Sequence, residues 1–291
     1  MRAASPWFEM PSPFDADARV LLLEPPSANA SELRARLLDE SYARPYVVDD
    51  GERRYLHFDG RLVQSAMSLA APNALDVRYT QKMMSFLLFQ PKPRRLVLIG
   101  LGGGSLVKFC HYRLPATHMT AVENNPDVIA LRDAFWLPSD GAKLQVIEGD
   151  GAHYLAGAEK GIDALLVDAF DRTGLAPSLA ERAFFELAHA KLAGSGLLVM
   201  NLAGDPLAYA GVVATAMEVF DQQVIVVPVP EDDNQVLLAF RNPRFEPNWR
   251  RLQGLAKEMR AKYGLDFPDF LEKIERSAKL GLARREAERR P

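Results

Sequence analysis

Residues 94–124 read Arg-Arg-Leu-Val-Leu-Ile-Gly-Leu-Gly-Gly-Gly-Ser-Leu-Val-Lys-Phe-Cys-His-Tyr-Arg-Leu-Pro-Ala-Thr-His-Met-Thr-Ala-Val-Glu-Asn. An apolar run enters a glycine cluster, a helix-like segment follows, and a second apolar run ends in Glu123. This order predicts a strand, a tight turn, a helix, and an acid about twenty residues on. Glycine lets a ligand approach the backbone, and a carboxylate can accept two hydrogen bonds from a ribose diol. The stretch therefore predicts a nucleoside-bearing cofactor, held in part by Gly100, Gly102, Gly103 and Gly104.

Composition limits the class of protein. The chain has 291 residues, 48% apolar and 25% charged, as in an ordinary globular protein of one large domain or one large and one small domain. A formal net charge of −3 leads us to expect no nucleic-acid partner. Cys110 is the single cysteine, and we find neither a signal-like N-terminus nor an apolar stretch of membrane length. We therefore expect a cytoplasmic protein without a membrane partner.

Strands and helices alternate after the glycine turn. We predict strands near 95–100, 118–123, 144–148, 162–168, 196–202, 223–229 and 235–241. We predict helices near 104–113, 126–135, 178–192 and 206–220, and closing helices over 247–262 and 268–288. Such alternation predicts a mostly parallel seven-stranded sheet covered on both faces.

The last two strands are joined by residues 230–234, which are too few for a helical crossover. The last strand is therefore predicted to be antiparallel. An α/β sheet of this kind is the Rossmann-like plan of class I S-adenosylmethionine-dependent transferases, and it is less typical of nicotinamide dehydrogenases.

The first part of the chain has a different pattern. Residues 1–43 are predicted to form a mostly irregular N-terminal arm, because their first thirty residues are rich in Pro, Ala and Ser. Within this arm, residues 18–24 could form a strand, and Ser31 could cap a short helix that ends near Glu40.

Residues 44–72 are predicted to form a small antiparallel β domain. Short apolar runs there are separated by Asp50-Gly51 and Asp59-Gly60, and Asp-Gly between apolar runs is a strong hairpin signal. Residues 73–291 then form the predicted nucleoside-binding transferase domain, which begins with a helix over 76–89 and ends with the closing helices.

Four acids follow predicted strands of the large sheet: Glu123, Asp150, Asp168 and Asp171. The ligand crevice of an open parallel sheet lies beyond the carboxyl ends of its strands, so we expect the four side chains to share one cleft.

Geometry suggests a role for three of them. We expect Glu123 to hold ribose hydroxyls, or alternatively to cap the turn that follows it. We expect Asp150 to accept from the adenine amino group, with Gly151 shaping its turn. Asp168 is a candidate to accept a proton from an amine, which must lose a proton before it attacks, or to hold a cationic amine. Loop hydrogen bonding is the alternative for Asp168.

Several segments together resemble the spermidine synthase family of polyamine aminopropyltransferases. They are Tyr-Leu-His-Phe-Asp-Gly-Arg-Leu-Val-Gln-Ser at 55–65, the loop at 100–105, Glu123, Gly149-Asp150-Gly151, and Val-Asp-Ala-Phe-Asp-Arg-Thr-Gly-Leu-Ala-Pro-Ser-Leu at 167–179. The resemblance covers roughly residues 44–241.

The resemblance implies roles for further residues. Asp168 would be the general base and would also lie at the donor's reactive end, and Asp171 would bind the acceptor amine. Gln64 would contact the nucleoside, and Tyr79 would line the acceptor side unless it packs in the core. A homodimer formed through the N-terminal hairpins is also implied.

Two positions depart from the family pattern. The family's glycine loop carries an Asp that binds the ammonium of decarboxylated S-adenosylmethionine, and Gly103 stands there instead. A loop Asp would repel the carboxylate of intact S-adenosylmethionine by about 4 kcal/mol at roughly 4 Å, so Gly103 also admits the intact donor. The family's late-loop Tyr is absent. The acids at 231–233 could hold a cation there, although a solvated hairpin tip is the simpler interpretation.

Three hypotheses follow. The first is transfer of an aminopropyl group from decarboxylated S-adenosylmethionine to a small amine. The second is methyl transfer from S-adenosylmethionine on the same scaffold. The third is a catalytically degenerate subunit that only binds the nucleoside. No metal is expected, because the five histidines lack metal-ligand spacing.

Overall fold

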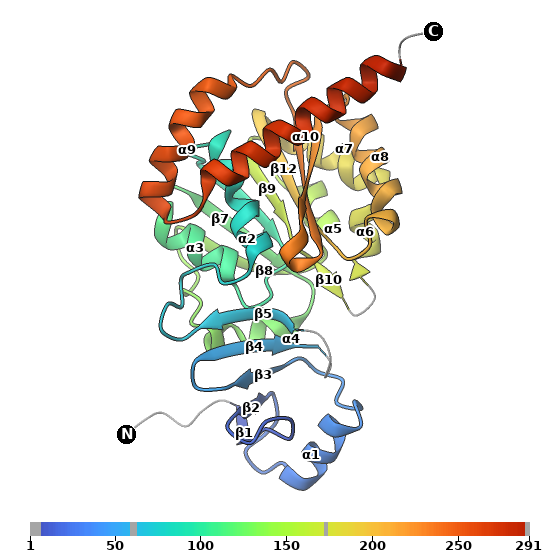
Figure 1. Cartoon of the computed structure of the whole chain (residues 1–291). Coiled ribbons are helices and arrows are strands. Elements are labelled where there is room, and N and C mark those ends of the chain that lie inside the picture. Colours follow the sequence, from blue (N-terminus) through green and yellow to red (C-terminus); the bar gives the residue numbers. More distant parts are fainter. Residues whose placement is uncertain (1–6, 59–62, 172–173, 289–291) are drawn as a thin grey trace.

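The structure is a computed structural model that describes residues 7–58, 63–171 and 174–288; the side chains of Asp171 and of residues 282–288 lie outside this description. A seven-stranded sheet forms its centre, in the order β13-β14-β12-β9-β6-β7-β8 (Figure 1). Its strands are β6 (Arg95–Ile99), β7 (His118–Glu123), β8 (Leu144–Glu148), β9 (Ile162–Val167), β12 (Leu192–Ala203), β13 (Val224–Val229) and β14 (Asn234–Phe240).

The strand directions confirm the predicted sheet. β6, β7, β8, β9 and β12 are parallel to one another, whereas β14 runs antiparallel to both β12 and β13. The central strands are buried on both faces, which explains why they read as continuous apolar runs.

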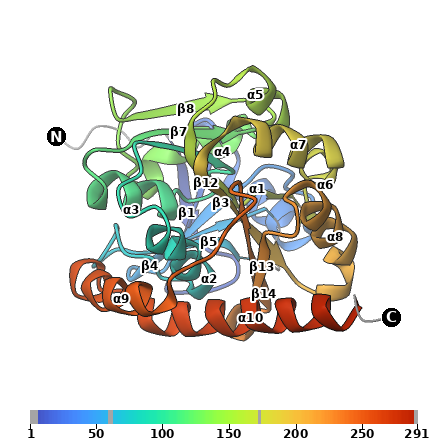
Figure 2. The ribbon, with the colours of Figure 1, turned by 90° about the horizontal axis from the view of Figure 1, so that it is seen from above.

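Helices cover both faces of the sheet (Figure 2). One face carries α2 (Arg78–Met83), the 3₁₀ helix η1 (Met84–Leu88), α3 (Ser105–Arg113), α4 (Pro126–Ala130), η2 (Arg132–Phe135), α9 (Trp249–Tyr263) and α10 (Phe267–Glu288). The other carries α5 (Gly151–Gly157), α6 (Pro177–Ala180), α7 (Arg182–Lys191), η3 (Pro206–Tyr209) and α8 (Ala210–Val219). Alternate residues of β6, β9, β12, β13 and β14 enter the two cores, as strand geometry requires.

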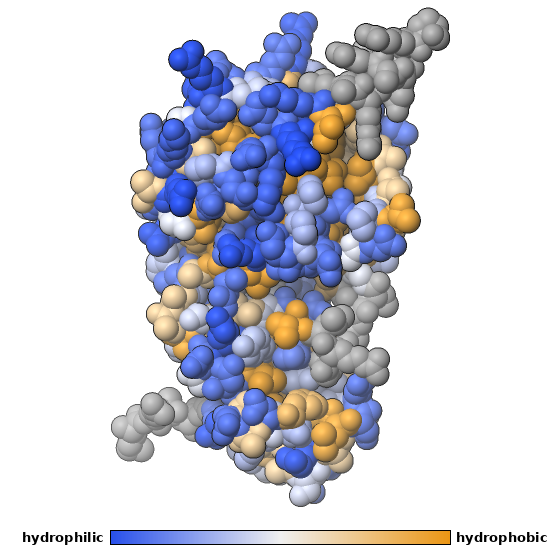
Figure 3. Space-filling view, in the orientation of Figure 1, coloured by the Kyte–Doolittle hydropathy of each residue, from blue (hydrophilic) through white to orange (hydrophobic). Residues whose placement is uncertain are grey.

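The closing helices are amphipathic. In α9 the buried residues recur with helical spacing, at Leu252, Ala256, Met259 and Tyr263. The opposite faces of α9 and α10 carry mainly hydrophilic residues, as Figure 3 shows. Among the described residues, no helix combines the length and the apolar character needed to span a bilayer.

A second, antiparallel sheet lies at one end of the large one (Figure 1). It runs in sequence order through β1 (Phe8–Pro11), β2 (Arg19–Leu22), β3 (Tyr46–Asp49), β4 (Arg53–His57) and β5 (Val63–Ser68). The β3–β4 turn is the predicted hairpin, with Gly51 at φ +85°. Asp59-Gly60 lies outside the described residues, and β4 and β5 pair antiparallel on either side of it.

The expectation of a mostly irregular arm is wrong for β1, while the strand and the short helix suggested within the arm are present as β2 and α1 (Ala30–Leu38). Val20 and Leu22 of β2 are fully buried in a small core with Leu33 of α1. The helix is capped by Asn29, whose Oδ1 accepts from the backbone N of Ser31 at 3.0 Å. The sequence had suggested Ser31 itself as the cap.

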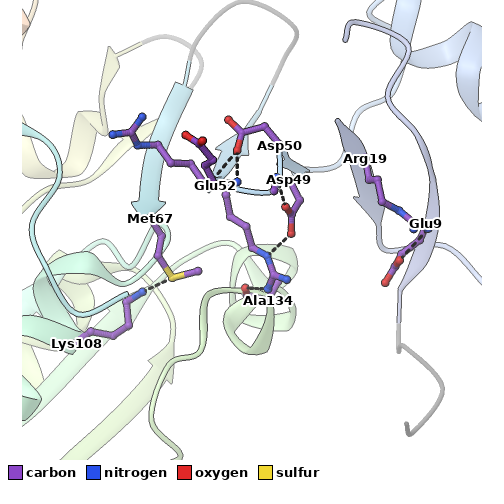
Figure 4. Close-up of polar contacts among 11 residues, drawn as sticks. Glu9, Arg19, Asp49, Asp50, Glu52, Met67, Lys108 and Ala134 are labelled. Atoms are coloured by element: carbon purple, nitrogen blue, oxygen red, sulfur yellow. Dashed lines mark hydrogen bonds and ion pairs between the residues drawn. The ribbon is translucent and has the colours of Figure 1, made fainter. Parts of the chain in front are cut away.

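Polar contacts join the two sheets (Figure 4). Arg54 of β4 donates to the backbone carbonyl of Ala134 in η2. Lys108 of α3 is fully buried and donates to the Phe135 carbonyl at 2.8 Å, while its Nζ lies 2.8 Å from Met67 Sδ of β5. Burial lowers the pKa of Lys108 to about 8. These contacts fix β5 over the helix that follows the glycine turn.

Candidate active site

A cavity of about 680 Å³ lies where the strands β6, β7, β8, β9 and β12 end, and residues of β5, α2 and the turn η4 (Pro230–Asp232) also line it. This is the crevice expected of an open parallel sheet. The predicted site residues that line it are Gln64, Tyr79, Gly100, Gly102, Glu123, Asp150, Gly151 and Asp168. Three of the four predicted acids therefore share one cavity. The fourth, Asp171, is in the short strand β10 (Phe170–Asp171), and its side chain lies outside the described residues.

The glycine turn is tightly packed. Gly100 has φ +92°, and a Cβ there would lie 2.1 Å from the carbonyl oxygen of Asp168, so no other residue fits. Gly103 and Gly104 do not line the cavity, and their part in cofactor binding stays a prediction. A Cβ on Gly103 would lie 2.7 Å from Ser65 Oγ, and one on Gly104 would meet a leucine side chain at 2.3 Å. The close approach of β5 to the turn thus accounts for Gly103.

Glu123 ends β7 and is buried. Its Oε2 accepts from the backbone N of Leu101 at 2.8 Å, and its Oε1 accepts from the backbone N of Asn125 at 2.8 Å. The cap of α4 is Asn125 itself, so Glu123 does not take the alternative role of capping that helix with its own side chain. An ionised carboxylate offers about four lone-pair sites, so acceptor capacity remains for a ligand in the cavity.

Asp150 follows β8 and caps α5, a helix that the sequence analysis missed. Its Oδ1 accepts from the backbone N of His153 at 2.8 Å, and its Oδ2 accepts from Ser178 Oγ at 2.9 Å. The signal was an Asp directly before a short helix-compatible run. Gly151 is required for packing, because a Cβ there would lie 2.3 Å from the Ile99 side chain.

Asp168 follows β9 and is held by side chains from distant parts of the sequence. Its Oδ1 accepts from Asn201 Nδ2 of β12 at 2.9 Å, and its Oδ2 accepts from the Tyr79 hydroxyl of α2 at 3.2 Å. Asn201 is oriented in turn, because its Oδ1 accepts from Asn234 Nδ2 of β14 at 2.7 Å. Neither asparagine was predicted as a site residue, because its only signal in the sequence is a polar residue in or beside an apolar strand.

The electrostatic setting of Asp168 suits proton transfer. Burial raises the pKa of Asp168, and the hydrogen bonds from Asn201 and Tyr79 oppose that rise. Burial beside this carboxylate also holds the pKa of Tyr79 well above its ordinary value, so the phenol stays protonated and donates. The result is a carboxylate of fixed orientation whose affinity for a proton is increased.

Tyr79 combines the two roles that the sequence left open. Its ring packs against the core cluster of the large sheet, while its hydroxyl reaches Asp168 in the cavity. Its backbone N donates to Asp232 Oδ2 of η4 at 2.6 Å. Asp232 also lines the cavity, whereas the sequence favoured a solvated hairpin tip for it over a cation-holding role.

Metal ligation receives no support from the side chains that the structure describes. Among them, no group of three or more His, Cys, Asp or Glu residues could hold a metal ion. The carboxylates of the cavity are instead bound to amide and hydroxyl donors.

Comparisons with known proteins agree with this geometry. The family model for the spermine/spermidine synthase domain matches residues 76–231. A polyamine aminopropyltransferase from Chromobacterium violaceum is 33% identical over 245 residues, which are 84% of this chain and 94% of that protein.

Solved structures share the fold. A probable spermidine synthase from Corynebacterium glutamicum superposes with a TM-score of 0.62 at 18% identity, over 81% of this chain and 92% of that one. Human methyltransferase-like protein 13 in complex with SAH superposes with a TM-score of 0.59 at 23% identity, over 64% of this chain and 92% of that one. Taken with the matched domain and the extent of the sequence identity, these findings establish that the chain belongs to the spermine/spermidine synthase family.

Proposed function

We propose that this chain is an aminopropyltransferase of polyamine biosynthesis, which moves an aminopropyl group from decarboxylated S-adenosylmethionine to a small amine. Its relative from Chromobacterium violaceum carries the name of that activity and matches over most of both chains. The observation that carries the proposal is Asp168, a carboxylate at the cavity that is fixed by Asn201 and Tyr79 and whose pKa is raised by burial.

One end of the cavity would bind the nucleoside of the donor, and the other would hold its reactive carbon and the acceptor amine. Glu123 and Asp150 would accept from the ribose hydroxyls and the adenine amino group of the donor, with Gln64 beside them. Asp168 would lie at the reactive end of the donor. Asp171 remains a predicted ligand of the acceptor amine.

The reaction would be one displacement. The neutral amine nitrogen attacks the carbon next to the sulfonium; the new C–N bond forms as the C–S bond breaks, and the sulfur keeps the electron pair as a neutral thioether of adenosine. The attacking nitrogen is neutral because Asp168 has first accepted a proton from the acceptor ammonium, and formation of the C–N bond leaves the product nitrogen as an ammonium. Tyr79 and Asn201 hold the carboxylate in one orientation, which lowers the entropic cost of the step.

Methyl transfer from intact S-adenosylmethionine is a second candidate, favoured by Gly103. A Cβ at this position would lie 2.7 Å from Ser65 Oγ and 3.1 Å from the Phe135 ring, so these side chains pack against the glycine. The glycine turn therefore presents no carboxylate to repel that of the intact donor.

Product mass after incubation with each donor and a panel of amines tests these alternatives. We expect aminopropylated product with the decarboxylated donor alone, and much less of it in the same time with Asp168→Asn. Methylated product would instead establish the second candidate. Absence of any product, together with retained nucleoside binding, would favour a catalytically degenerate subunit.

We also infer a homodimer. β1 is an edge strand of the N-terminal sheet, and its outer backbone groups suit pairing with a second copy. Light scattering should give twice the mass of one chain, whereas the mass of one chain would refute the dimer. The cytoplasmic location stays a prediction.

A further inference from the structure

The turn between β13 and β14 carries three consecutive acids whose surroundings differ. Glu231 is exposed, and its Oε2 lies 3.8 Å from Lys82 Nζ. Asp233 is exposed and adopts a left-handed conformation at φ +53°. Asp232 alone of the three lines the cavity. A solvated hairpin tip therefore describes Glu231 and Asp233 but not Asp232.

The Asp232 carboxylate serves a backbone amide and keeps acceptor capacity. Its Oδ2 accepts from Tyr79 N at the start of α2, where Val77 occupies the N-cap position and its side chain makes no capping bond. Asp232 thus caps this helix from another part of the chain. Among the described residues, no Lys or Arg forms an ion pair with Asp232, so its negative charge faces the cavity without a cationic partner.

Tyr79 relates the two carboxylates of the amine side. Its backbone N binds Asp232, and its hydroxyl binds Asp168, so the two acids lie at opposite ends of one tyrosine. Both line the same cavity. A molecule with two amine nitrogens could therefore present one to each carboxylate.

We propose that Asp232 determines acceptor specificity by binding the ammonium group distal to the reacting amine, so that diamines are selected over monoamines. The inference rests on the proposed aminopropyl transfer. A charge-assisted hydrogen bond to the carboxylate replaces the hydration that the ammonium loses in the cavity. A monoamine of the same carbon length leaves Asp232 without that partner.

The test compares Asp232→Asn with Asp233→Asn, which makes the same charge change one residue away. Asparagine keeps the shape of the side chain, and its oxygen still accepts from Tyr79 N, so the cap of α2 is preserved. We expect Asp232→Asn to raise the KM for 1,4-diaminobutane about tenfold to a hundredfold, as a bond to a charged group implies. The KM for butylamine and the kcat should stay nearly constant. Asp233→Asn should match the wild type with both amines.

Two results would overturn the proposal. An equal rise of the diamine KM in both variants would show that the negative charge of the turn attracts the diamine without a specific contact to Asp232. Equal losses with diamine and monoamine in Asp232→Asn would show only a structural role. If the wild type transfers aminopropyl groups to no amine, the proposed function fails. Calorimetry of 1,4-diaminobutane binding then still tests whether Asp232 binds a diamine. Weaker binding by Asp232→Asn then supports the site, while equal binding, or none by either protein, removes it.

Discussion

The two sides of the cavity are built by different means. On the proposed nucleoside side, Glu123 and Asp150 mainly bind backbone amides near the ends of the parallel strands, and the Ser178 hydroxyl also donates to Asp150. On the amine side, Asp168 is bound by the side chains of Tyr79 and Asn201, which come from α2 and β12. The first arrangement follows from the strand ends of the sheet. The second exists only when elements far apart in the sequence have packed together.

The same difference distinguishes carboxylates that stabilise the fold from the carboxylate that is proposed to act in the reaction. A carboxylate that holds backbone amides stabilises the turn around it, so its removal should affect folding and binding together. A carboxylate whose pKa is raised by burial destabilises the folded protein in its ionised form. The same burial increases its affinity for a proton, which favours its action as a base. Variants on the two sides should therefore differ in kind as well as in size.

The largest effect is expected for Asp168→Asn. The asparagine can keep both hydrogen bonds, with its oxygen toward Asn201 and its amide toward the Tyr79 oxygen, but it cannot accept a proton. The rate of transfer should fall by about 10²- to 10⁴-fold. Steady-state kinetics at saturating amine and donor measure this loss, and a loss below tenfold would contradict the assignment of Asp168 as the base.

The same variant has an opposite effect on stability. The pKa of folded Asp168 is raised above its ordinary value of 3.8, so its favourable contribution is present below that value and is lost as the pH rises through the folded pKa. At neutral pH, Asp168→Asn should therefore melt at or above the temperature of the wild type, and this advantage should shrink in acid. Thermal melts of both proteins at several pH values check the sign of this change in melting temperature. A variant that melts below the wild type at neutral pH would contradict the prediction.

A smaller loss is expected for Glu123→Gln on the nucleoside side. Both carboxylate oxygens accept from backbone N–H groups, and the glutamine NH₂ must face either Leu101 N or Asn125 N. Unfolding free energy should drop by about 1–3 kcal/mol, and the donor KM should rise about tenfold. The kcat at saturating donor should change little. Chemical denaturation and donor titration measure the two effects.

Asp150→Asn is the matched control for that variant. Asparagine caps helices as well as aspartate does, so the bond to His153 N can persist. Stability should therefore change by less than in Glu123→Gln. Equal destabilisation by the two substitutions would show that the backbone contacts of Glu123 have no special weight.

The sequence predicted the nucleoside side better than the amine side, for a physical reason. Glycines and acids at the ends of apolar strands follow from chain order alone, and Glu123, Asp150 and Asp168 indeed line one cavity. Asn201 and Asn234 lie in apolar strands, where one polar residue does not reveal its partner before the strands are paired.

β1 was missed, and β2 was suggested only as a possible strand, for a related reason. β1 and β2 have four residues each, too short for a clear alternation of apolar and polar residues. Their burial depends on α1 and on Tyr46 of β3, which closes the same small core. Local composition alone therefore suggested an irregular arm.

The smallest effect is expected for Tyr79→Phe, which tests the side-chain network of the amine side. The ring can still pack against the core, and the backbone N can still donate to Asp232, so the fold should not change. Asp168 loses a hydrogen bond that lowers its pKa, so that pKa should rise further. Asp168 acts as a base only when ionised, and the acidic limb of the kcat/KM profile should therefore move to higher pH. At the plateau, where Asn201 still orients the carboxylate, we expect only a several-fold loss of rate. A pH profile of wild type and variant separates these effects: an acidic limb that stays in place, or moves to lower pH, would mean that the Tyr79 hydroxyl does not tune the base.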